Sequence, residues 1–129
     1  MAKKVTFRGK TAEELKPMSL EEFVKIIPSH QRRTMQRMGA KIKNFLHQFR
    51  KRKANGKKTM KTQVRDMVIL PEMLDFEFLV YNGKEWMKVL PQLPMLGHRL
   101  GNYSITTKLV RHSGPGIGAT RGSKSVELK

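Results

Sequence analysis

The residue types that most often carry out chemistry form no reactive pattern in this chain. Its four histidines, His30, His47, His98 and His112, are separated by 17, 51 and 14 positions, whereas metal sites favour histidines only a few residues apart. There is no cysteine, so a thiol nucleophile, a thiolate metal site and a disulfide are all excluded. No serine lies in a Gly-x-Ser-x-Gly turn. We therefore predict no catalytic residue, no metal site, no cofactor and no enzymatic activity.

The glycine-rich segment 114–125, GPGIGATRGSKS, is similar to a phosphate-binding loop in composition only. Such a loop has a lysine directly after its last glycine, then a serine or threonine, on a turn between a strand and a helix. Here Ser123 follows Gly122, so the motif fails. Because small residues cannot bury enough apolar surface to hold a fold, we predict an extended tail here.

The charge of the chain favours a polyanionic partner, with nucleic acid as the first candidate. Its 129 residues include 27 lysines and arginines against 10 acidic residues, a net charge of +17. Residues 29–63 hold twelve basic residues and no acid, whereas 64–100 hold four basic and five acidic residues. We therefore predict one domain with arms: a basic helical extension at 1–63, an α+β core at 64–110 and an extended tail at 111–129.

Helices are predicted throughout the basic extension. Thr11 with Glu14 and Ser19 with Glu22 each place a carboxylate three residues after a hydroxyl, which is typical of a helix start. A longer helix is predicted from Ser29, because apolar residues recur every three or four positions and form one stripe. The stripe consists of Met35, Met38, Ile42, Phe45, Leu46 and Phe49.

The basic residues of this long helix and of the following loop are the first predicted RNA contacts. They could form an ordinary solvated face, but such faces mix charges, and no acid is present here to form pairs along the helix. The run around Asn55 and Gly56 could equally be a mobile loop. The candidates are Arg32, Arg33, Arg37, Lys41, Lys43, Arg50, Lys51, Arg52, Lys53, Lys57 and Lys58.

The core segment is predicted to contain a small sheet packed with helices. An apolar, β-branched run at 64–70 ends at Pro71 and is expected to be a strand. Two further runs, 76–81 and 84–90, flank Asn82 and Gly83, and a two-residue Asn-Gly loop is a strong signal for a β-hairpin. Aromatic residues make up only 7% of the chain, which favours contacts with the phosphates and 2′-hydroxyls of structured RNA over stacking on single strands.

Four segments, read together, resemble one protein family. They are RDMVILPEM at 65–73, YNGKE at 81–85, LGHRLGNY at 96–103 and RHSGPGIGATRGS at 111–123. In this order and spacing they are similar to the small ribosomal subunit protein numbered nineteen in bacteria and fifteen in eukaryotes. The segment 19–33 resembles the helical extension of archaeal and eukaryotic members. Ser104, Ile105 and Thr106 depart from the bacterial pattern, so bacterial contacts are not transferred there.

The resemblance implies an α+β protein of the small-subunit head that binds ribosomal RNA. It also implies a neighbouring protein, the one numbered thirteen, and a tail directed toward the decoding region and its tRNA. Within the matching segments, glycines 83, 97 and 101 are expected to serve backbone geometry or close approach to RNA. The implied RNA contacts are Lys84, His98, Arg99, Lys108, Arg111, His112 and Arg121, with Lys124 adding charge at the far end of the tail.

Alternative interpretations stay open for individual residues and for the whole chain. His98 could instead be neutral and packed against the core, and Arg65 could pair with Asp66. A DNA-compacting protein is the main alternative function, and a membrane-surface helix is another. The first ten residues lack the apolar stretch of a signal peptide, and no segment approaches the roughly 18 apolar residues of a membrane span, so we predict a cytoplasmic ribosomal protein without a membrane partner.

Overall fold

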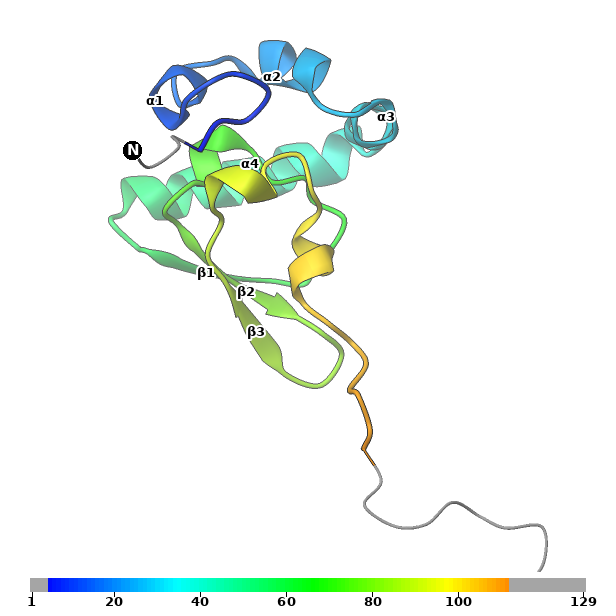
Figure 1. Cartoon of the computed structure of the whole chain (residues 1–129). Helices are drawn as coiled ribbons and strands as arrows, with labels where there is room; N and C mark the ends of the chain where they lie inside the picture. The colour runs from blue at the N-terminus through cyan, green and yellow to red at the C-terminus, as the bar shows by residue number, and fades with distance from the viewer. Residues whose placement is uncertain (1–4, 112–129) are drawn as a thin grey trace, which may run out of the picture.

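The computed structural model describes residues 5–111, which form an α+β fold of four helices and a three-stranded sheet (Figure 1). The first two helices are short: α1 spans Ala12–Leu15 and α2 spans Leu20–Ile26. Both begin where the sequence predicts. The Glu14 carboxylate accepts a hydrogen bond from the backbone N–H of Thr11 at 3.0 Å, and the Glu22 carboxylate accepts one from Ser19 at 3.3 Å. Each acidic side chain therefore satisfies a backbone donor at a helix start.

The single long helix predicted from Ser29 is wrong, because the chain forms two helices there. Helix α3 covers Ser29–Arg37 and α4 covers Gly39–Ala54. Met38 lies between them with φ −95° and ψ 26°, and it ends one helix while it begins the next. Glycine is a poor residue inside a helix, so the Met38–Gly39 step is a low-cost place for a bend. The bend still leaves Met35 and Ile42 buried on its two sides.

The sheet has the order β1-β2-β3, with β1 at Thr59–Thr62, β2 at Glu77–Tyr81 and β3 at Trp86–Val89. Strand β1 is parallel to β2, and β2 is antiparallel to β3. The strand predicted at 64–70 is wrong. That run, whose last four residues are buried, pairs with residues 97–101 outside the sheet, and β1 comes from the preceding polar segment.

The predicted hairpin is confirmed, but its loop has four residues rather than two. Tyr81 pairs with Trp86, which leaves 82–85 as the loop. The side chain of Asn82 accepts hydrogen bonds from the backbone N–H groups of Lys84 at 2.9 Å and Glu85 at 2.7 Å. Gly83 has φ +106°, a conformation that side chains disfavour. Asn82 thus shapes the turn through its side chain, as asparagine often does.

Helix α4 and the sheet share one hydrophobic core. The rings of Phe45 and Phe49 on α4 lie 6.1 and 5.8 Å from that of Phe78 on β2, and Phe49 meets Phe76 edge-on at 5.0 Å. Figure 1 shows α1, α2 and α3 at the end of the molecule opposite the hairpin turn, with α4 between them and the strands. The segment after residue 104 leaves the fold beside that turn.

Candidate nucleic-acid interface

Seven of the predicted contact residues form one class that we call the outward cations. All are exposed, and among residues 5–111 none forms an ion pair or donates a side-chain hydrogen bond. They are Arg33 and Arg37 on α3, Lys43, Lys51 and Arg52 on α4, and Lys57 and Lys58 in the segment that follows. Because no acid lies between positions 29 and 63, their charges repel one another unless an external anion neutralises them.

Arg32 differs from its neighbour Arg33, because its guanidinium points into the protein. It donates hydrogen bonds to the carbonyls of Val24 at 3.1 Å, Lys25 at 2.7 Å and Ile27 at 3.4 Å. These carbonyls belong to the end of α2, where a helix lacks its own donors. Arg32 therefore closes α2 and holds it against α3.

Three further cations of α4 are partly engaged within the protein. Arg50 forms a two-pronged pair with Glu72, at 3.0 Å from Nε and 2.7 Å from Nη2, and this hydrogen bonding and the carboxylate charge raise the pKa of Arg50. Lys53 donates to the backbone carbonyl of Glu72 at 2.9 Å. Lys41 lies 3.9 Å from Asp66, the longest of these contacts. All three side chains are exposed, so each can still approach an anion.

Arg65, in the first motif segment, does not pair with Asp66. Its guanidinium donates to the carbonyls of Tyr81 at 2.7 Å, Gly101 at 3.0 Å and Ser104, and to the Ser104 hydroxyl at 3.0 Å. A backbone bond from Gly101 N–H to the Arg65 carbonyl, at 2.8 Å, joins the same two segments. A Cβ at Gly101 would lie 3.1 Å from that carbonyl oxygen, so the glycine permits a close approach between protein segments.

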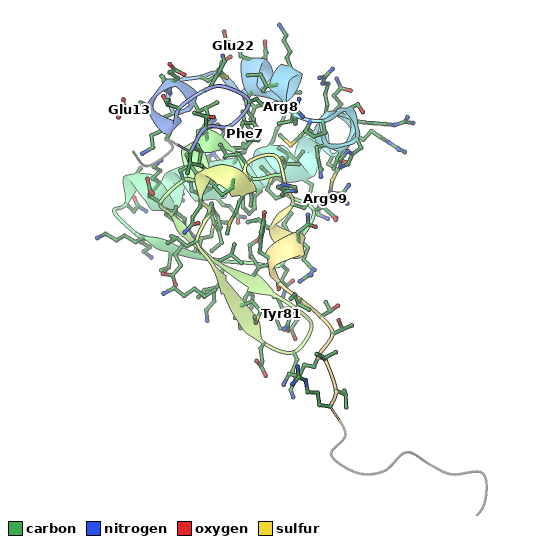
Figure 2. The ribbon with its side chains drawn as sticks, viewed as in Figure 1. Phe7, Arg8, Glu13, Glu22, Tyr81 and Arg99 are labelled. Atoms are coloured by element: carbon green, nitrogen blue, oxygen red, sulfur yellow. The ribbon has the colours of Figure 1, made fainter. Side chains whose placement is uncertain are left out.

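The glycine-bracketed segment places Arg99 and His98 in opposite environments. Arg99 is half-buried and donates to the side chains of Gln31 at 3.2 Å and Thr34 at 3.1 Å, so it ties this segment to α3 (Figure 2). His98 is exposed, and its ring meets that of Tyr103 edge-on, with centroids 6.4 Å apart. Partial burial raises the pKa of Tyr103. The alternative of a histidine packed in the core is therefore wrong, and His98 is open to a partner.

The hairpin turn and the start of the tail lie together. The Asn82 amide donates to the carbonyl of Ile105 at 3.3 Å. Lys84 and Lys108 are both exposed and line a hollow of about 490 Å³ between the turn and residues 105–108. Arg111 is also exposed. The remaining predicted contacts, His112, Arg121 and Lys124, lie outside the described residues.

Lys61 is a further exposed cation of the acid-free stretch 29–63 that is missing from the contacts predicted from the sequence. This exposed residue sits on β1, between the buried residues Met60 and Thr62. The alternation of polar and apolar residues in that strand is the signal that could have placed it. This signal is weaker than that of the following run at 64–70, which is far more apolar and therefore matches a strand better.

The exposed cations suit ionic and hydrogen-bonding contacts with an anion. Within residues 5–111, no three histidine, cysteine, aspartate or glutamate side chains gather closely enough to hold a metal ion. None of the helices in that range is long and apolar enough to cross a membrane. What the described surface offers is a series of guanidinium and ammonium groups that reach solvent, which is the chemistry of phosphate contacts.

Comparison with known proteins identifies the family. Residues 33–112 match the family described as ribosomal protein S19. The small ribosomal subunit protein uS19 of Saccharolobus solfataricus is 45% identical over 130 aligned positions, which cover 98% of this chain and 93% of that protein. The uS19 protein of Methanococcoides burtonii is also 45% identical, over 96% of this chain and 88% of its own length. The chain therefore belongs to the ribosomal protein S19 family, whose members are structural ribosomal proteins and not enzymes.

Proposed function

We propose that this chain is a structural component of the small ribosomal subunit that binds ribosomal RNA in the subunit head. The observation that carries the proposal is the set of outward cations. Seven guanidinium and ammonium groups reach solvent from α3, α4 and residues 57–58 without an acidic partner among the described residues. Phosphate groups of folded RNA supply the missing negative charge, and releasing their counterions drives binding.

A second group of contacts is proposed at the opposite end of the fold. Lys84 in the hairpin turn and Lys108 at the start of the tail are exposed and line the same hollow, and Arg111, three residues further along the chain, is exposed as well. His98 is exposed as well and can donate or accept a hydrogen bond. Arg99 is excluded from this group in our proposal, because its guanidinium is occupied by Gln31 and Thr34.

The partners that follow from the family resemblance are proposals of the same kind. We propose that the neighbouring protein is the small-subunit protein numbered thirteen, and that the tail beyond residue 111 points toward the decoding region and its tRNA. The basic residues of that tail, His112, Arg121 and Lys124, would then meet tRNA or ribosomal RNA. Truncation after Ser113 tests this: we expect normal subunit occupancy with altered tRNA binding, and unchanged tRNA binding would contradict it.

Sedimentation of a tagged chain from extract of its native cells tests the main proposal. We expect the chain to migrate with small ribosomal subunits, and to stay with them at moderate salt. A matched variant with Arg33, Arg37, Lys51 and Arg52 changed to glutamine should be displaced at lower salt while remaining folded. Migration with DNA, or as free protein at low salt, would contradict the proposal.

A further inference from the structure

Trp86 on β3 is the chain's single tryptophan, and its side chain is 39% exposed. The strand register places it on the opposite face of the sheet from the buried positions Phe78, Val80 and Val89, while the hollow described below brings it beside residues of α4. Tryptophan is enriched among the residues that contribute most to binding at interfaces, so an exposed indole on a folded surface is a candidate contact.

Two side chains contact the indole of Trp86. The ring of Tyr81, its partner across the hairpin, lies 5.1 Å away at a 47° tilt, and Figure 2 shows Tyr81 near the hairpin end of the sheet. From β1, the ammonium of Lys61 lies 5.6 Å from the centre of the indole. Lys61 thus makes a cation–π contact on a surface where water competes, so the contact is weak and can exchange.

Trp86 borders a hollow of about 370 Å³ between α4 and the 61–64 segment. The size falls within the range of pockets that hold small ligand groups. The residues that line it include three with amide side chains, Asn44, Gln48 and Gln63, and two lysines, Lys41 and Lys61. Amides can donate to and accept from the edge of a nucleobase, and ammonium groups can contact a phosphate.

No acidic residue lines this hollow. Asp66 lies 3.9 Å from Lys41 and Glu77 lies 3.0 Å from Lys88, so each has a cation. Glu85, next to Trp86 in the chain, lines the hollow at the hairpin turn instead. The charge of the hollow is therefore positive, which disfavours a basic protein segment as its occupant. An aromatic ring, two ammonium groups and three amides together match a nucleotide with an unpaired base.

We propose that this hollow binds one unpaired nucleotide of the RNA, with its base stacked on Trp86. The base replaces the Lys61 ammonium over the indole, and Lys61 and Lys41 then contact the adjoining phosphate. The amides of Asn44, Gln48 and Gln63 face the base edge. This inference rests on the proposed RNA-binding function, but it adds a site that recognises single-stranded rather than helical RNA.

The intrinsic fluorescence of the full chain tests the proposal, because Trp86 is the only indole that reports. The probes are a short single-stranded RNA and a duplex RNA of equal length, both followed in parallel by anisotropy of an end label. We expect the single strand to quench the indole in a saturable way and the duplex to bind without comparable quenching. Equal quenching by both, or binding of the single strand without quenching, would overturn this site while the proposed function stands.

Amino-acid substitutions distinguish stacking of a base on Trp86 from general attraction between the basic protein and RNA. Trp86→Leu should weaken binding of the single strand about tenfold, whereas Trp86→Phe should keep most of the affinity. Lys61→Gln should weaken it as well, while the matched change Lys88→Gln, on the same face but paired with Glu77, should have little effect. If Trp86→Leu fails to fold, the quenching of the wild-type indole still shows whether a base stacks on Trp86. Absence of RNA binding by anisotropy would overturn the proposed function together with this site.

Discussion

Two arginines of α3, Arg33 and Arg37, and the two arginines of the motif segments between residues 65 and 103 have opposite orientations. Arg33 and Arg37 project from α3 into solvent without a protein partner among the described residues. Arg65 and Arg99, which lie in the segments that resemble the family most closely, turn inward and hold the protein together. An arginine inside a recognisable motif is therefore not, on that ground, a contact with RNA.

The difference follows from where unpaired carbonyls occur. Helix carbonyls are bonded within the helix, so an arginine in the middle of α3 or α4 finds no acceptor on its own backbone. Irregular segments leave carbonyls that need donors, and Arg65 supplies them to Tyr81, Gly101 and Ser104. Arg32 obeys the same rule, because its acceptors are carbonyls at the C-terminal end of α2, which lack donors within the helix.

The largest effect that would sharpen this comparison is expected from Arg65→Lys. A single ammonium cannot replace a planar guanidinium that bonds three carbonyls and a hydroxyl, so we expect a loss of about 3 kcal/mol in the free energy of unfolding. The control Arg33→Lys should change it by less than about 0.5 kcal/mol. Denaturant titration measures both, and equal stabilities of the two variants would break the comparison.

Gly101→Ala should have a smaller effect, about 2 kcal/mol. Its new Cβ would lie 3.1 Å from both the Cβ and the carbonyl oxygen of Arg65, and the backbone atom cannot move aside without loss of packing. Gly39→Ala is the matched control, because no atom lies within 4 Å of its Cβ position. Thermal unfolding should show a lower Tm for the first variant only. A Tm for Gly101→Ala equal to that of the wild type would contradict the close approach.

The smallest effect is expected at the pair between Arg50 and Glu72. The two-pronged geometry is good, but Arg50 is mostly exposed, so Glu72→Gln should cost only about 0.5 kcal/mol of unfolding free energy. The same change frees the guanidinium, and we expect binding to ribosomal RNA to stay the same or tighten slightly. A loss of RNA affinity would show that the pair itself is needed for binding.

Local signals in the sequence were sufficient for helix starts and for the hairpin, because those depend on residues close together in the chain. The carboxylates of Glu14 and Glu22 lie at the predicted positions, and β2 and β3 pair around the Asn82 turn. The parallel pairing of β1 with β2 joins residues far apart and has no local signature. The apolar run at 64–70 has the composition of a strand, but its buried part, 67–70, lies outside the sheet and its partner is the segment 97–101.

Candidate contact residues could be chosen by charge, but the direction of each side chain could not. The acid-free stretch correctly indicated where exposed cations would gather. It could not separate Arg32 from Arg33, because that depends on which faces of α3 meet the end of α2. Lys61 and Trp86 meet only when β1 and β3 flank β2, so their contact had no signal in the sequence.

The salt dependence of binding to the ribosomal RNA of the subunit head tests the central claim most directly. Changing Arg33, Arg37, Lys51 and Arg52 to glutamine should make the slope of log K against log salt shallower by about 3, since each lost phosphate contact removes about 0.7 to 0.9. Arg99→Lys, whose site faces inward, should keep the wild-type slope. An unchanged slope in the four-residue variant, or a shallower slope in the Arg99 variant, would contradict the account.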